Sequence, residues 1–163
     1  MIFNVLLESC VLCLMLLLGC VAGIANGAEG LVCFYEKEVH ERVVSLGLTT
    51  HARIKHNANL FKLFVLLPGV IFSVAAVYGL NGARGFFEGF WQLALIWVLE
   101  GLFDRLFIDW YWVGKTKAWV IPGTEDLMPY IYGKTLAGKW LMTLIGYPLL
   151  SAVIAGIMAV IIR

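Results

Sequence analysis

Charged residues are scarce in this chain: only 14% of its 163 residues are Asp, Glu, Lys or Arg. Soluble domains average about 25% charged and about 45–50% apolar residues, whereas 61% of the residues here are hydrophobic. The mean hydropathy is +0.89. A soluble fold of this size could not bury so much apolar surface. The composition therefore excludes a soluble globular enzyme, a disordered tail and a small disulfide-stapled module. It predicts an integral membrane protein in contact with the lipid bilayer.

The chain also lacks an excess of charge of either sign and the common catalytic motifs. Twelve Lys and Arg residues face eleven Asp and Glu residues, so no basic surface predicts a nucleic-acid partner. Of the three histidines, His51 and His56 are five positions apart, which does not match a helical metal-ligand pair. Walker, GxSxG and dinucleotide-binding motifs are missing. We therefore expect no metal site, and the sequence leaves the reaction and any cofactor unassigned.

Long apolar runs are what the sequence has instead. A membrane-spanning helix needs about 20 predominantly apolar residues, and four runs qualify: 5–28, 60–80, 86–113 and 140–162. We expect an all-α fold, in which residues 1–163 form a single transmembrane domain built as a four-helix bundle.

Positive residues accumulate in the segments that follow the first and third spans. Nine Lys and Arg residues lie in or beside these segments, against two on the other side, Arg84 and Arg163. By the positive-inside rule, the first and third inter-helix segments are cytoplasmic and both termini lie outside.

The two cytoplasmic segments have different local patterns. Residues 35–44 combine good helix formers with opposite charges at helical spacing, so we expect the first helix to run on past the bilayer. Gly47 is a natural stop, and Thr49 or Thr50 a natural N-cap for the next helix. In the other segment, Pro122-Gly123 predicts a turn and Thr124 a cap for a short helix.

Small residues predict close helix packing. Gly19, Gly23 and Gly27 form one stripe of the first helix, and such stripes let backbones touch inside a protein or between subunits. We expect a homo-oligomer, a dimer or a trimer. Pro68 and Pro148 fall within spans and should kink them.

Cys10-Val-Leu-Cys13 resembles the redox motif of the bacterial disulfide-oxidase membrane family. That family has a second cysteine pair in an extracytoplasmic loop, which is missing here. Reactive thiols need an electropositive, partly wet setting, whereas these lie among Leu, Met and Val. We interpret the cysteines as small hydrophobic residues, and a redox role of Cys10 and Cys13 stays open.

Four charged residues fall inside the third span: Glu100, Asp104, Arg105 and Asp109. A charge there costs at least about 2.5–3.5 kcal/mol unless it is paired, wet or ligand-bound. Glu100 and Asp104 share one helix face, and Arg105 and Asp109 share the adjoining one. These four are the candidate catalytic residues.

Other polar residues fall at a similar depth on neighbouring helices, and we predict that they bind substrate in a shared cytoplasm-facing cavity: Asn26, Glu29, Arg53, His56, Asn57 and Lys62. Arg105 cannot lose its proton, so it needs a partner. Asp109 is nearest in sequence, and Glu29 is the partner expected across the bundle. A protonated Glu100, a bound cation or Lys62 could offset the excess negative charge. The alternative is a buried charge network that only fixes helix register.

Two short segments resemble the MAPEG superfamily of microsomal glutathione transferases and eicosanoid enzymes. Arg53-Ile-Lys-His-Asn57-Ala-Asn-Leu60 matches the Arg and Asn of the family's glutathione-site pattern but has Leu60 in place of Glu. Leu102-Phe103-Asp104-Arg105-Leu106 is similar to a stretch of its third span. The resemblance implies four spans and a thiol transferase using glutathione, in which Arg53, Asn57 and Arg105 lower the thiol pKa so that the thiolate attacks a lipophilic electrophile.

Three functions fit the pattern. The first is an enzyme or binding protein that holds a lipophilic or amphipathic substrate in a one-sided polar cavity. The second is a proton- or cation-coupled transporter or channel subunit that uses Glu100 and Asp104. The third is a non-catalytic membrane subunit that docks a partner through its cytoplasmic helices and residues 122–126. The apolar outer half of the third span favours the first.

The Lys and Arg distribution predicts that Lys37 and Lys117 face the cytoplasm, while Met1 and Arg163 lie outside. In a cysteine-free background, a membrane-impermeant maleimide applied to intact cells should label Arg163→Cys and spare Lys117→Cys. Efficient labelling at position 117 but not at 163 would reverse the orientation.

Overall fold

The computed structural model describes residues 1–162 and is all-helical over that range, without a β-strand. Four helices in it are long and apolar enough to cross a membrane: Ile2–Ile24, His51–Leu80, Gly85–Val113 and Gly133–Ile161. The predicted all-α chain with four apolar helices is thereby confirmed. Arg163, expected outside the membrane, lies beyond the described residues.

The last three spans each contain stretches of π-helix, whose backbone hydrogen bonds run from residue i to residue i+5. The first span is α1 (Ile2–Ile24), and the second consists of α3 (His51–Phe61), the π-helix Lys62–Leu66, α4 (Leu67–Ala75) and the π-helix Ala76–Leu80. The third span consists of α5 (Gly85–Phe103) and the π-helix Asp104–Val113. The fourth consists of α6 (Gly133–Leu141), the π-helix Met142–Gly146 and α7 (Tyr147–Ile161). Pro68 and Pro148 each come just after a π-helical stretch, where the missing proline N–H is accommodated.

Three span boundaries differ from those expected. The first helix ends at Ile24, before residue 28, because the backbone leaves the helix at Gly27, whose φ is +131°. The second span begins at His51, well before residue 60, because the Thr50 side chain accepts a hydrogen bond from the Arg53 N–H at 3.2 Å. This confirms Thr50 as the N-cap. The fourth span begins at Gly133 instead of residue 140.

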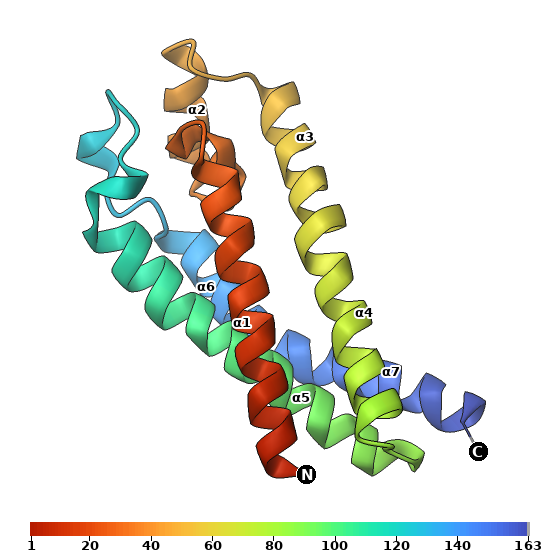
Figure 1. The fold of residues 1–163 in the computed structure, drawn as a ribbon. Helices are drawn as coiled ribbons and strands as arrows, with labels where there is room; N and C mark the ends of the chain where they lie inside the picture. Colours follow the sequence, from red (N-terminus) through yellow and green to blue (C-terminus); the bar gives the residue numbers. More distant parts are fainter. Residues whose placement is uncertain (163) are drawn as a thin grey trace.

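A compact cap covers one end of the spans. It consists of the 3-10 helix Ala28–Phe34, α2 (Lys37–Ser45) and the segment 114–132, which includes the 3-10 helices Lys117–Trp119 and Glu125–Leu127. The expected continuation of the first helix into residues 35–44 is wrong, because the 3-10 turns separate α1 from α2. Figure 1 shows the cap at the end of the molecule opposite the N-terminus and the last turn of α7.

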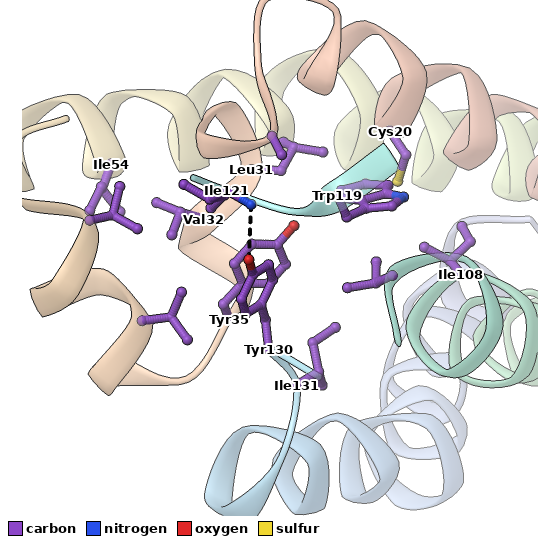
Figure 2. Close-up of a cluster of buried hydrophobic side chains, with 14 of the residues drawn as sticks. Cys20, Leu31, Val32, Tyr35, Ile54, Ile108, Trp119, Ile121, Tyr130 and Ile131 are labelled. Carbon is purple, nitrogen blue, oxygen red and sulfur yellow. Dashed lines mark hydrogen bonds between the residues drawn. The ribbon is translucent and has the colours of Figure 1, made fainter. Parts of the chain in front are cut away.

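Buried apolar and aromatic side chains hold the cap to the spans. The cluster joins residues of the cap, such as Val32, Tyr35, Trp119 and Tyr130, to Ile108 of the third span (Figure 2). Because it links segments far apart in the sequence, the cap packs as one unit with the helices beneath it.

The predicted turn at Pro122-Gly123 is present, and Gly123 has a φ of +83°. Thr124 is the N-cap residue of the short helix Glu125–Leu127, as expected, but its side chain makes no capping hydrogen bond. Its hydroxyl donates to the carbonyl oxygen of Ile121 at 2.8 Å and lies 2.7 Å from the Tyr130 hydroxyl, so it stabilises the turn from inside.

The third and fourth spans form the main helix pair of the bundle, and α1 also packs on α5. The second span diverges from α5 toward the cap (Figure 1). Gly101 permits the close approach of the fourth span, because a Cβ there would lie 2.8 Å from Cγ2 of Thr143. In the predicted glycine stripe, Gly19 faces Val65 of the second span, while Gly23 faces Leu31 of the cap.

Gly30 occupies the junction of α1, the cap and α3. A Cβ at this position would collide with the backbone carbonyl oxygen of Gly23, and the Gly30 carbonyl accepts a hydrogen bond from Asn57 at 2.9 Å. Gly30→Ala should therefore lower stability by about 1–3 kcal/mol through overpacking. Gly156→Ala, where no other atom lies within 4 Å, is the matched control. Thermal unfolding in detergent measures both, and equal midpoints would contradict the packing at this junction.

Candidate functional site

A cavity of about 190 Å³ lies between the four spans, directly beneath the cap. One part of its wall is ionisable and the rest is apolar or aromatic. The charged lining comes from Glu100, Asp104, Arg105, Asp109 and Lys139. The rest of the lining includes Leu16, Cys20, Leu31, Tyr35, Leu66, Ile108, Val113, Trp119, Ile131, Met142 and Tyr147.

Asp109 joins two cations from different helices. Its Oδ2 lies 2.8 Å from Nε of Arg105 in an ion pair that is not aligned as a hydrogen bond. Its Oδ1 accepts a hydrogen bond from Nζ of Lys139 at 2.8 Å. Arg105 also pairs with Asp104. The side chains of Arg105 and Asp109 are only 6% and 4% exposed, so these charges depend on one another for stabilisation.

The local backbone explains this arrangement. Asp104, Arg105 and Asp109 all lie in the π-helix Asp104–Val113, and single-turn π-bulges inside helices are often found at functional sites. Lys139 reaches them from the end of α6, because Gly101 allows the fourth span to approach. The small size of Gly101 on the facing helix therefore lets Lys139 reach the charged cluster.

Glu100 lines this cavity and also a second one of about 300 Å³. The two cavities share Leu16, Leu66, Met142 and Tyr147, so they adjoin along the bundle. The second cavity is lined mainly by apolar side chains, including Leu12, Val70, Trp97 and Leu150. Glu100 is 8% exposed and has no hydrogen-bond or ion-pair partner within residues 1–162.

The predicted substrate-binding residues do not join the charged cluster. Asn26, Glu29, Arg53 and Asn57 line a groove of about 630 Å³ between α1 and the second span, and this groove meets the cavity only at Leu31 and Phe61. His56 and Lys62 are exposed and line none of these cavities.

The expected partners of Arg105 are therefore partly wrong. Asp109 is a partner, as its spacing indicated, but Lys139 provides the contact across the bundle in place of Glu29. Lys139 also provides the second positive charge, and Lys62 does not. One sequence signal for Lys139 existed: it is a lone cation at the start of an apolar run, where it needs a carboxylate partner.

The cap supplies two residues that sequence reasoning missed. Tyr35 and Trp119 line the cavity, and their side-chain polar atoms, the Tyr35 hydroxyl and the Trp119 Nε1, are buried without a hydrogen-bond partner in the part of the chain that the structure describes. Leaving such a group unpaired costs about 1–3 kcal/mol.

A second polar network lies toward the opposite end of the spans. The side-chain amide of Asn81 donates to Oε2 of Glu8 at 3.0 Å and to Oε1 of Gln92 at 2.9 Å. Val77, Leu93 and Ile96, all fully buried, belong to the apolar core that surrounds this region. The network is thus separated from Glu100 by apolar packing.

The cysteines show no sign of redox chemistry in their surroundings. All four are free thiols; Cys10 is exposed on the side of α1, and Cys20 faces the cavity. In the cap, burial raises the pKa of the Cys33 thiol to about 11, which disfavours the reactive thiolate. Among residues 1–162, no three His, Cys, Asp or Glu side chains gather as a metal site would require.

Comparison with protein-family models, curated proteins and solved structures finds no match to this chain. The resemblance to the MAPEG superfamily, and with it the use of glutathione, stays a prediction. Arg53 and Asn57 line the groove between α1 and the second span, whereas Arg105 lines the cavity beneath the cap.

Arg105→Ala should destabilise the protein by about 3–5 kcal/mol, because it leaves Asp109 and Asp104 with less compensation inside the bundle. Lys115→Ala is the control. Lys115 is an exposed cation 4.3 Å from the centre of the Trp110 ring, a contact worth about 0.5–1 kcal/mol. Unfolding in detergent micelles compares the two variants. An Arg105→Ala protein as stable as Lys115→Ala would show that the cluster is not a buried network.

Proposed function

We propose that this protein binds a lipophilic or amphipathic molecule in the cavity between its four spans, with the cap on the cytoplasmic side. The observation that carries the proposal is the buried network of Arg105, Asp109 and Lys139, which opens onto an otherwise apolar cavity. Ligand sites are typically apolar cavities that contain a few well-placed polar groups. The Lys and Arg bias supports the orientation.

The dimensions of the interior space fit an elongated molecule. The cavity of about 190 Å³ beneath the cap adjoins the more apolar one of about 300 Å³, and Glu100 lies where they meet. A polar end would lie near Arg105 and Lys139, and an apolar end would extend between Leu12, Val70 and Leu150.

Two other functions have less support. Transport needs a polar route through the bundle, yet Leu93 and Ile96 are completely buried between Gln92 and Glu100 on the same helix. In residues 122–126, Thr124 is fully buried and Asp126 pairs with Arg42 at 3.2 Å, so the exposed Pro122, Gly123 and Glu125 are what is left to dock a partner. Binding is what these contacts support best, and a reaction on the bound molecule would use Glu100, Asp104, Arg105 or Asp109.

Cavity filling tests the proposal. Cys20→Phe places a ring in the cavity, whereas Cys10→Phe adds the same ring to the exposed side of the same helix. A decyl diazirine photoprobe should label residues around the cavity in the wild type and in Cys10→Phe, and should lose that labelling in Cys20→Phe. Peptide mass spectrometry locates the adducts. Labelling confined to outward-facing residues in the wild type would contradict ligand binding inside the bundle.

A further inference from the structure

The cap presents two hydrogen-bond donors that no group in residues 1–162 satisfies. The hydroxyl of Tyr35 and the Nε1 of Trp119 are both buried without a partner within the described chain. Tyr35 is only 3% exposed and Trp119 only 2%, and both residues line the cavity that Arg105 and Lys139 also line. Because buried donors are normally paired, these two orphans indicate missing acceptors in the cavity.

Tyr130 provides an internal comparison for Tyr35. The two rings pack with their centroids 4.9 Å apart. The Tyr130 hydroxyl accepts a hydrogen bond from the Ile121 N–H at 2.9 Å and contacts Thr124, so it holds the cap together. In Figure 2 the Tyr35 hydroxyl points instead to the side on which Leu31 and Trp119 lie. The cap therefore uses one tyrosine hydroxyl for its own structure and leaves the other free.

The chemistry of the two groups specifies what they can bind. An indole N–H only donates. Burial and the neighbouring Tyr130 raise the pKa of Tyr35 well above its usual value, so its hydroxyl keeps the proton that it can donate. Trp112 packs edge-on against Trp119 at 4.9 Å and holds the indole in place. Both groups can thus donate to an oxygen acceptor on the bound molecule.

The charge around the cavity favours a neutral acceptor. The two cations, Arg105 and Lys139, are already matched by the carboxylates of Asp104 and Asp109. Glu100 adds a further carboxyl group and no cation, so no positive charge in the lining is left over for an anionic ligand. Leu31, Val113 and Ile131 complete the lining near the cap and fit an apolar body.

We propose that the cavity recognises a neutral lipophile through a carbonyl oxygen, which accepts a hydrogen bond from Tyr35. A carbonyl oxygen has lone pairs and no proton, so it fits the donor that Tyr35 presents. Ketones, esters, amides and quinones share this chemistry. The Nε1 of Trp119 lies at the end of the indole near Cys20 (Figure 2), so it is a donor to a different part of the bound molecule. The proposal rests on the proposed function, because it names the class of molecule that occupies the same cavity.

Methyl nonyl ketone is a suitable probe. Undecane is the matched analogue that lacks the carbonyl group, and undecanoate is the matched analogue that carries a negative charge. Binding to the protein in nanodiscs is measured by equilibrium competition with the decyl diazirine photoprobe. The wild type should bind the ketone more tightly than undecane or undecanoate. Tyr35→Phe removes one hydrogen bond and should weaken ketone binding about tenfold while leaving undecane unchanged.

Tyr130→Phe is the control, since it loses a structural hydrogen bond and should keep the preference for the ketone even if its stability falls. Infrared spectroscopy of the carbonyl-labelled ketone gives an independent readout. The carbonyl stretching band of the bound ketone should lie at lower frequency in the wild type and move to higher frequency in Tyr35→Phe.

The outcomes separate this inference from the proposed function. Equal binding of ketone and undecane, unaffected by Tyr35→Phe, would overturn carbonyl recognition and leave the cavity as a ligand site; water would then serve the two donors. Tighter binding of undecanoate would also overturn it. If none of the three compounds displaces the photoprobe from cavity residues, and Cys20→Phe changes nothing, the proposed function itself fails.

Discussion

The structure depends on the sharing of one carboxylate, that of Asp109, between Arg105 and Lys139. Charges in the middle of apolar helices are costly, and Arg105 has no way of becoming neutral. The carboxylate therefore joins the third span to the fourth at a fixed register. The same groups form the polar wall of the cavity, so the interaction that stabilises the bundle also defines its candidate site. A network that only fixed helix register would need no adjoining space, yet one cavity lies against this network and a second cavity adjoins the first.

The cap completes the site from outside the spans. Its apolar cluster packs on Ile108 and Val113, close to the ionic network, and closes the cavity at that end. The cap uses Tyr130, Thr124 and the Arg42–Asp126 pair to fix its own loops. Tyr35 and Trp119 remain available to a bound molecule. The cavity thus has an ionic wall from the spans and a neutral, donating wall from the cap, and a ligand would meet both.

Much of the architecture follows from the sequence, because length and hydropathy determine whether a helix can span a bilayer. The Arg105–Asp109 contact also follows, since four-residue spacing brings side chains together on a helix. The pairing of Lys139 with Asp109 and the role of the cap donors could not be predicted, because these contacts depend on tertiary packing between distant segments. Gly101 sets the approach of the fourth span, and the π-helix beginning at Asp104 changes which side chains face inward. The early end of α1 placed Glu29 and Asn26 in the groove between α1 and the second span, away from Arg105.

The most direct test of the account is a cryo-electron microscopy map of the protein purified in nanodiscs from its native membrane. We expect elongated density inside the bundle, beginning within hydrogen-bond reach of Tyr35, passing Trp119 and Arg105, and continuing between Leu12 and Leu150. Collapsed side chains filling both cavities, with lipid density only on the outer surface of the helices, would contradict a ligand site in the bundle.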